Sequence, residues 1–311
     1  MQKNTPINAY AASEAISAGS KDEQPKSQGL RPHFGLDTIF LLLFLLYLFV
    51  PLGATLVFGL TGNNGLDFHS YQQIFADKDF SNTLLLSLEL AFATTLLAVI
   101  LITPTAYWVQ LRLPQARPLM DFLSLVPFAV PAILLSLGLV EVYSGSNTFI
   151  NIVSLGLVPI LSNQPFNVVN TSPLLVCAYV IVSLPYTYRP IDNALRAINT
   201  RVLTEAAYSL GSGWWRTFLT IVLPNILPGI ISSALLTFAT AMGEFTLASL
   251  FGIYTFPIYL NEVGQNDAHK AASLSIVSFL FTLICVLGII LVVGRLGRGR
   301  GNQQVEIAAA K

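Results

Sequence analysis

Residues 36–60 read LDTIFLLLFLLYLFVPLGATLVFGL, an apolar run whose one charged side chain is Asp37. At a helical rise of about 1.5 Å per residue, this run is long enough to cross a hydrocarbon core of about 30 Å. It starts late in the chain and is too long for the apolar segment of a secretory signal. We therefore expect it to remain in the mature protein as a membrane helix.

Five further apolar runs of similar length follow: Thr83–Tyr107, Leu119–Val142, Pro173–Ile191, Ile226–Phe251 and Ala271–Arg295. Of the 311 residues, 54% are hydrophobic and 10% are charged, whereas soluble domains carry charge on about a quarter of their residues. A soluble fold of this composition would expose large apolar patches. The sequence predicts an all-α polytopic membrane protein with six transmembrane helices.

The segments outside these runs are polar or short. Residues 1–35 are rich in Ser, Ala, Gln and Lys, and we expect a disordered cytoplasmic tail there, a transmembrane domain over 36–298, and a second cytoplasmic tail over 299–311. Phe149–Leu161 is apolar but too short to span a bilayer. It is either an interfacial helix or a loop on the outer surface.

The distribution of arginine predicts the orientation. Arginines follow the second, fourth and sixth runs: Arg112, Arg117, Arg189, Arg196, Arg201, Arg216, Arg295, Arg298 and Arg300. The other three connections contain only Lys78 and Lys270 as cations. Because positively charged loops stay in the cytoplasm, we expect both termini to be cytoplasmic.

The longest connection, over about residues 192–224, reads DNALRAINTRVLTEAAYSLGSGWWRTFLTIVLP. It is too polar to span a membrane, yet its apolar residues have helical spacing on both sides of Gly211 and Gly213. Glycine is typical of a helix C-terminus. The pattern predicts two short helices that meet at a glycine corner on the cytoplasmic surface. The alternative is an amphipathic helix that rests on lipid headgroups.

Seven residues of this connection carry a resemblance: Glu205, Ala206, Ala207, Gly211, Ile221, Leu223 and Pro224. They match every fixed position of the EAA loop in the permease subunits of binding-protein-dependent ABC importers. The resemblance implies a type I, MetI-like permease bundle, in which this loop couples transport to a cytoplasmic ATPase. Small Ala206 and Ala207 would let the ATPase approach, Gly211 permits a corner, and Glu205 offers a charged contact.

The resemblance implies a bacterial inner membrane. It also implies partners: a cytoplasmic ABC ATPase dimer, a second and usually different permease chain, and an extracytoplasmic solute-binding protein. This sequence has no GxxxxGK[ST] phosphate loop, so we expect it not to be an enzyme, to bind no cofactor, and to rely on the partner ATPase for ATP hydrolysis. Cys177 and Cys285 have no metal-site spacing, and we expect no metal. The formal net charge of zero gives no basic field for nucleic acid.

Three carboxylates lie within apolar runs: Glu89, Glu141 and Glu244. Charges inside a membrane are costly and often functional, so Glu244 and Glu89 are candidates for the translocation path. The alternative is that each is hydrogen-bonded to Ser or Thr between packed helices, or, for Glu141, that it lies among the headgroups. The stretch GEFTLASLF, followed by TFPIYL, resembles permeases for polyamines, 2-aminoethylphosphonate and ferric iron, and these substrates are cationic or carry an amine.

Two other classes of protein are alternatives to an importer permease. An ion-gradient-driven secondary transporter is the alternative function, but six spans without an inverted repeat argue against it. A membrane enzyme is a third reading, but the sequence has no HExxH, GxSxG or paired-aspartate motif. The sequence therefore favours an importer permease.

Overall fold

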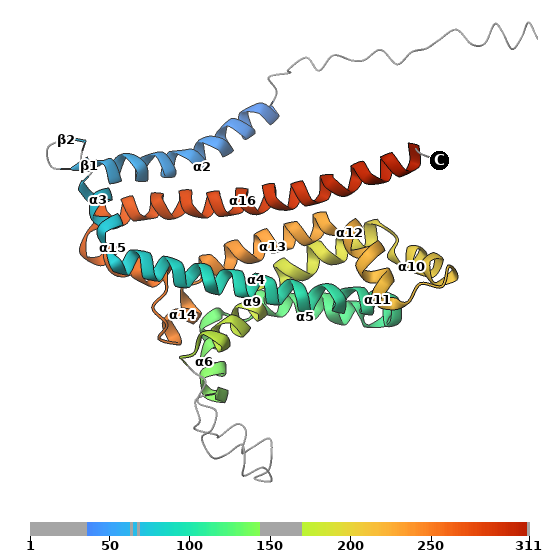
Figure 1. Ribbon diagram of the computed structural model, residues 1–311. Helices are drawn as coiled ribbons and strands as arrows, with labels where there is room; N and C mark the ends of the chain where they lie inside the picture. Colours follow the sequence, from blue (N-terminus) through green and yellow to red (C-terminus); the bar gives the residue numbers. More distant parts are fainter. Residues whose placement is uncertain (1–35, 63–64, 67–68, 144–169, 310–311) are drawn as a thin grey trace, which may run out of the picture. The chain divides into compact units, whose positions relative to one another are not determined.

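The computed structural model describes residues 36–62, 65–66, 69–143 and 170–309 (Figure 1). The expected N-terminal tail and the Phe149–Leu161 stretch lie outside these residues. The chain forms two compact units, Met1–Leu52 and Gly53–Lys311, and the boundary between them falls within helix α2 (Leu36–Leu60).

The described residues are almost entirely helical. After α2 come the two-residue antiparallel strands β1 (Thr61–Gly62) and β2 (Gly65–Leu66), and then these helices: α3 (His69–Ala76), α4 (Lys78–Arg112), η1 (Pro114–Ala116), α5 (Arg117–Ala129), α6 (Ala132–Tyr143), α9 (Ser172–Ala197), α10 (Thr200–Ser209), α11 (Trp214–Thr217), the π-helical η2 (Phe218–Val222), α12 (Leu223–Asn225), α13 (Leu227–Met242), α14 (Thr246–Leu250), α15 (Phe256–Asn266) and α16 (Ala268–Ala309).

Among the described residues, four continuous helical segments are long and apolar enough to cross a membrane: Thr38–Leu60, Lys78–Arg112, Ser172–Ala197 and Ala268–Leu291. Two bent pairs add up to two more crossings, which gives up to six. One pair is Pro114–Ala129 with Ala132–Tyr143, bent by 99°, and the other is Trp214–Asn225 with Leu227–Met242, bent by 74°. The predicted helical membrane fold is confirmed, but two of the six predicted runs are not single straight helices.

The breaks have local causes. Val130, with φ −96° and ψ 117°, is extended because it precedes Pro131, and a residue before proline is disfavoured in the helical region. The predicted run Ile226–Phe251 is interrupted after Met242, where α13 ends, and α14 begins only at Thr246. The expectation that Glu244 lies inside one continuous helix was therefore wrong.

The core of the second unit is formed by α4, α9 and α13, which pack against one another. At Gly229 the backbone of α13 approaches α9 so closely that an added Cβ would come within 2.4 Å of the Ala194 Cβ. Nearby, the hydroxyls of Thr187 and Thr237 share a hydrogen bond of 2.7 Å between the same two helices. Small and hydroxyl-bearing residues thus allow close contact between these helices. In a bilayer such contacts matter because the hydrophobic effect contributes little to the association of membrane helices.

The bundle is closed at one end by α3, α15 and the start of α16 (Figure 1). The Phe256 N–H donates to Ser87 Oγ at 2.8 Å, which joins α15 to α4. Ser273 Oγ donates to the Gly59 carbonyl at 2.8 Å, so the end of α2 is held on α16. This end holds a polar network that is described below.

Within the first unit, the described part of α2 is apolar around its whole circumference, and nearly all its side chains are exposed within this chain. A helix that is apolar all round is typical of a segment surrounded by lipid or by other apolar helices.

Candidate functional site

The connection that follows α9 is a folded surface segment and begins with a sharp change of direction. Asn199, with φ 47°, lies in the left-handed region, ends α9 and leads directly into α10. The inward face of α10 presents Thr204, which shares a hydrogen bond of 3.1 Å with the Tyr107 hydroxyl of α4. This buried contact fixes α10 on the transmembrane core.

The corner after α10 is a Schellman motif built on Gly211. The Ser212 N–H donates to the Ala207 carbonyl at 3.0 Å, and the Gly211 N–H donates to the Tyr208 carbonyl at 2.9 Å. Gly211 itself has φ +81°, a conformation that glycine adopts at far lower cost than other residues. The predicted glycine corner is confirmed, and the second glycine, Gly213, has an ordinary φ of −81°.

Beyond the corner, aromatic rings anchor α11 and η2 to α4. The Tyr107 ring stacks on Phe218 with centroids 5.1 Å apart and lies 5.6 Å from Trp214. Trp214 and Phe218 stack on each other at 5.6 Å. Such aromatic pairs contribute about 0.5–1.5 kcal/mol each beyond their burial. Tyr107 therefore holds both arms of the glycine corner at once.

The outward face of the same segment is apolar and has no cover within the described chain. Leu210, at the tip of the corner, is 89% exposed. Val202 and Ala206 are exposed on α10. Beside them, Glu205 accepts a hydrogen bond from Arg201 Nε at 2.8 Å. This surface, which we call the corner face (Val202, Glu205, Ala206 and Leu210), is exposed and mostly apolar within the described chain.

The seven sequence-predicted loop residues fall into three positions. Glu205 and Ala206 lie on the corner face, whereas Ala207 is buried and its small size serves packing inside the chain. Gly211 forms the turn. Ile221, Leu223 and Pro224 are half-buried on η2 and α12, where they lead into α13. The expectation that both alanines face a partner therefore applies to Ala206 alone.

An ion-pair cluster lies next to this segment and joins α5 to α9. The buried carboxylate of Asp192 meets Arg196 at 2.6 Å and Arg117 at 3.7 Å. Arg196 also lies 3.7 Å from Asp121. A buried carboxylate needs such partners, so the cluster ties the start of the third membrane segment to the helix that carries the corner.

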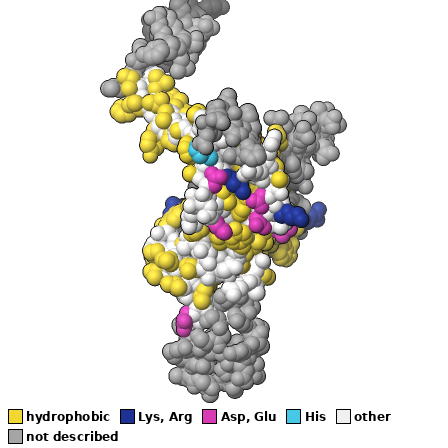
Figure 2. Space-filling view, turned by 90° about the vertical axis from the view of Figure 1, so that its left-hand side faces the viewer, with side chains coloured by type: hydrophobic (Ala, Val, Ile, Leu, Met, Phe, Trp, Pro, Cys, Tyr) yellow, Lys and Arg dark blue, Asp and Glu magenta, His cyan; other side chains and the backbone are white. Residues whose placement is uncertain are grey.

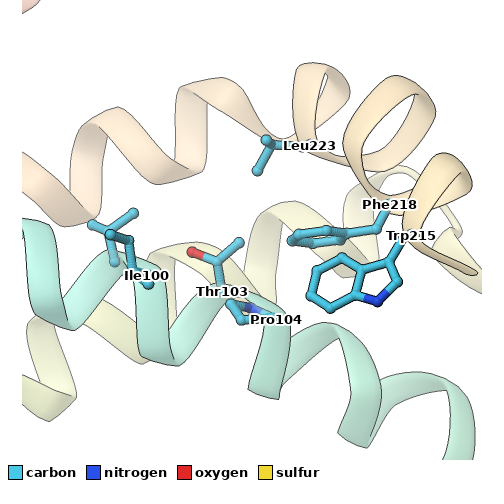
Figure 3. A pocket seen from close by; sticks show the side chains of 7 residues that line it. Ile100, Thr103, Pro104, Trp215, Phe218 and Leu223 are labelled. Atoms are coloured by element: carbon cyan, nitrogen blue, oxygen red, sulfur yellow. The ribbon is translucent and has the colours of Figure 1, made fainter.

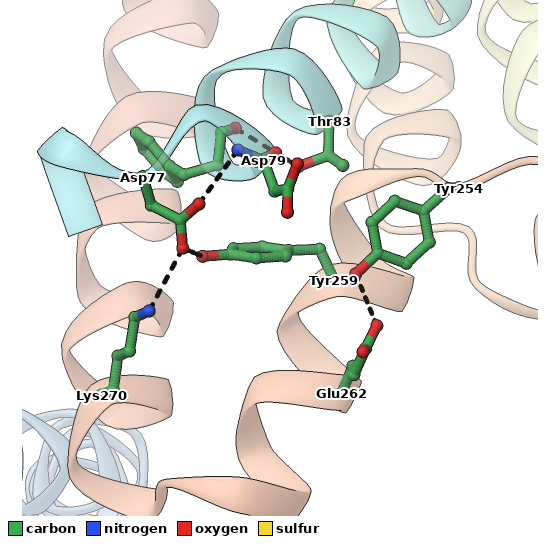
Figure 4. A network of polar contacts seen from close by, with 8 residues as sticks. Asp77, Asp79, Thr83, Tyr254, Tyr259, Glu262 and Lys270 are labelled. Carbon is green, nitrogen blue, oxygen red and sulfur yellow. Dashed lines mark hydrogen bonds and ion pairs between the residues drawn. The ribbon is translucent and has the colours of Figure 1, made fainter. Parts of the chain in front are cut away.

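The opposite end of the bundle carries a different kind of site. Asp77 caps α4 by accepting from the Asp79 N–H at 3.0 Å, and it also accepts from the Tyr259 hydroxyl at 2.7 Å and from Lys270 Nζ at 3.2 Å (Figure 4). These donors, Tyr259 first, hold the pKa of Asp77 below its ordinary value of 3.8. The network clamps α4, α15 and α16 together.

Beside this clamp is an open pocket of about 380 Å³ whose lining includes Asp79, Glu262 and Asp267. The Tyr254 hydroxyl donates to Glu262, and burial together with this bond raises the pKa of Tyr254 to about 12. Figure 2, which looks onto this end, shows acidic and basic side chains gathered in one area beside apolar surface. The pocket is a polar, predominantly acidic surface.

The three carboxylates of the apolar runs do not come together. Glu244 lies in the break between α13 and α14, where its carboxylate accepts from the N–H groups of Thr246 at 3.2 Å and Leu247 at 2.9 Å. It is half-buried, and its partners are backbone amides rather than the predicted Ser or Thr hydroxyls. Glu89 is exposed on α4, and Glu141 is exposed near the end of α6.

Sequence reasoning missed the residues that hold the corner in place. Tyr107 and Thr204 are 97 positions apart, and neither belongs to the motif. Thr204 and Ala207 are three positions apart, so they lie on the same side of α10. This spacing was the available signal for an inward face. No pattern in the sequence pairs that face with Tyr107.

Fold and site together define a polytopic helical membrane protein. Between two of its membrane segments, α9 and α13, it carries a folded surface segment. Residues 114–298 match the family model described as "Binding-protein-dependent transport system inner membrane component". Because the match covers more than half of the chain, this protein belongs to that family. The resemblance inferred from the loop residues is confirmed.

Similar proteins include permeases that are named for different substrates. The chain is 29% identical over 168 residues to the spermidine/putrescine transport system permease protein PotB of Haemophilus influenzae, covering 53% of this chain and 57% of that protein. It is 31% identical over 179 residues to PotB of Escherichia coli, covering 57% and 62%. It is 34% identical over 168 residues to the molybdenum transport system permease protein ModB of Azotobacter vinelandii, covering 54% and 70%. The matches to both PotB proteins thus span less than two thirds of those proteins.

The fold also resembles a solved structure, that of a bacterial ABC transporter involved in the import of the acidic polysaccharide alginate. The TM-score is 0.63 at 16% identity, and the match covers 85% of this chain and 93% of that chain. At this identity the likeness concerns the fold alone.

Proposed function

We propose that this chain is the permease subunit of an ATP-driven importer and that the corner face docks on a cytoplasmic ATPase. One observation carries the proposal. Leu210 is 89% exposed at the tip of a segment that turns at Gly211 and is held on the transmembrane core by Tyr107. A rigid surface with apolar side chains is suited to transmit movement from a docked partner to α4 and α13.

The remaining parts of the importer follow from this assignment. The transmembrane domain is proposed to span residues 36–298 with both tails in the cytoplasm, because the arginine-rich connections lie at the corner end. The acidic end with Asp79 and Glu262 then faces outward, toward an extracytoplasmic binding protein. The chain binds no nucleotide or metal itself, and it works with a second permease because ABC ATPases act as dimers.

For the substrate, we propose a small cationic or amine-bearing solute, with polyamines first. The outward pocket presents three carboxylates against the single cation Lys270, and Glu244 and Glu89 provide further negative charge along the proposed path. Opposite charge raises the local concentration of a cation at such a surface. 2-Aminoethylphosphonate and ferric iron are the other members of the proposed group.

The test is uptake by the transporter reconstituted in vesicles with its ATPase, its second permease and its binding protein. Spermidine, putrescine, aminoethylphosphonate, ferric iron and molybdate are each offered with ATP or with a non-hydrolysable analogue. We expect ATP-dependent uptake and ATPase stimulation with polyamine and none with molybdate. Molybdate uptake without polyamine uptake would overturn the substrate class, and uptake driven by an ion gradient without ATP would overturn the function.

A further inference from the structure

A pocket of about 320 Å³ lies between α4 and the segment that follows the glycine corner (Figure 3). The wall on α4 includes Ile100, Thr103 and Pro104, and the opposite wall includes Trp215, Phe218 and Leu223. Ile100 and Trp215 are 57% and 63% exposed, so the pocket is open to the surroundings of the chain. Because α4 is a membrane-spanning helix, those surroundings are lipid or another membrane chain.

The lining of the pocket is apolar apart from the Thr103 hydroxyl and the backbone at the proline. Pro104 has no N–H, so it leaves the Ile100 carbonyl without its helical donor. Thr103 is 2% exposed, and its hydroxyl has no partner among the described residues. Thr103 lies three positions after Ile100, a spacing at which a threonine hydroxyl can donate to a carbonyl of the preceding turn, but no such bond forms in this structure. Because the other lining side chains are apolar or aromatic, the pocket suits an apolar occupant.

From this pocket a continuous ridge runs to the end of α4. Ile100, Pro104, Trp108 and Arg112 are spaced by four residues and so form one row on the helix surface. Trp108 is exposed, and Arg112 is exposed in the last turn without an ion pair in the part of the chain that is described. Pro104 and Arg112 are separated by about 12 Å of helix rise.

We propose that this ridge binds an anionic phospholipid, with its phosphate at Arg112, its interfacial region beside Trp108 and one acyl chain in the pocket. Arginine pairs strongly with phosphate, tryptophan is enriched at the membrane interface, and basic sites at the cytoplasmic ends of helices attract anionic headgroups. Along one face of α4 a cation is followed by an aromatic ring and then by an apolar pocket. The phosphate, interfacial and acyl-chain layers of a phospholipid come in the same order. The charge of Arg112 is what favours a lipid over an apolar helix as the occupant.

The occupant would touch the coupling segment directly. Phe218 packs on Tyr107, and Leu223 is one of the loop-motif residues. An acyl chain in the pocket would therefore fill the space between α4 and the helix that leads into α13. We infer that anionic lipid stabilises the corner in its docked arrangement.

The test is native mass spectrometry of the whole purified transporter after exchange into phosphatidylglycerol or phosphatidylcholine. Retention of phosphatidylglycerol is expected to fall at least fivefold in Arg112→Gln, which removes the charge, and in Val99→Phe, which fills the pocket. Arg189→Gln is the matched control, because Arg189 is also exposed on a membrane helix without an ion pair among the described residues. Equal retention in all four proteins, or equal retention of both lipids by the wild type, would overturn the proposal.

A second measurement separates lipid from a protein occupant. A photoreactive benzoylphenylalanine at position 100 is irradiated in the assembled transporter in membranes. A mass increase equal to one phospholipid on this chain is the expected result. A cross-link to a second permease chain would show that protein covers the pocket and would contradict the proposal.

Discussion

The two ends of the bundle differ in how their side chains are satisfied. At the corner end, Leu210 is 89% exposed within the described chain, while Tyr107 holds the segment from within. At the opposite end, Asp77 receives three donors from within the chain, and Glu262 is paired with Tyr254. The corner end therefore leaves an apolar side chain uncovered within the described chain, whereas the other end is held together by its own contacts.

Under the proposed function, the ATPase docks at the corner end and solute arrives at the acidic end. An apolar surface on a rigid corner gains stability when a partner buries it, so a stable docked complex is favoured there. A polar surface that is already hydrogen-bonded suits brief contact with a partner that must leave in each cycle.

The largest effect is expected at Gly211. Gly211→Val places a β-branched residue at φ +81°, and a left-handed conformation costs a non-glycine residue about 1–2 kcal/mol. Because about 1.4 kcal/mol is a factor of ten in an equilibrium, we expect transport to fall about tenfold while the protein remains in the membrane.

Gly213→Val is the matched control for this change. Gly213 has φ −81° and ψ 165°, which any residue adopts, and an added Cβ there would meet no atom within 4 Å. Transport by this variant should stay close to wild type. Equal loss in both variants would mean that the positive φ of Gly211 is not what the site requires.

A smaller effect is expected at Glu244, which we propose faces the translocation path. Glu244→Gln keeps an oxygen that can accept from the Thr246 or Leu247 N–H but removes the charge. If the charge attracts the substrate by about 1 kcal/mol, uptake should fall roughly fivefold for a dication and less for a zwitterion. Normal uptake of both substrates by a well-assembled variant would leave Glu244 with the capping role alone.

The smallest effect is expected at the acidic end. Because the folded-state pKa of Asp77 is lowered, the stability that its ionised form contributes is present at neutral pH and is lost as pH falls through that pKa, below 3.8. Asp77→Asn should therefore lower stability by about 1 kcal/mol at pH 7. The difference from wild type should shrink below about pH 4.

Thermal unfolding of both proteins in nanodiscs between pH 3 and pH 7 measures this difference. Asp121→Asn provides a comparison at the corner end, where the carboxylate is exposed and lies 3.7 Å from Arg196. A constant difference between wild type and Asp77→Asn across this pH range would argue against an ionised Asp77 as the source of the stability.

The sequence predicted the local features of this fold well. The run Leu36–Leu60 has the bounds of α2, and the glycine corner forms at Gly211. Both depend on neighbouring residues alone, through hydropathy and through the backbone freedom of glycine. The likeness of the loop to importer permeases followed from spacing within one short segment.

Sequence reasoning missed two kinds of feature. One is contacts between distant segments, and the other is helix breaks that the mean hydropathy of a run conceals. The runs that contain Pro131 and Gly243 are predominantly apolar, and their mean hydropathy does not reveal that the helix stops within them. The burial of Ala207 and the anchoring by Tyr107 arise from packing between segments far apart in the chain. Such pairings are set by the whole bundle and have no local signature.

The most direct test of the central claim is site-specific cross-linking within the assembled transporter. A photoreactive residue is placed at Leu210 on the corner face or, in a second variant, at Tyr254 on the acidic end, and the complex is irradiated in membranes with its ATPase and binding protein present. The account predicts that position 210 cross-links to the ATPase and that position 254 does not. Cross-linking of the ATPase from position 254, or its absence from position 210 in an active transporter, would contradict the assignment of the coupling site.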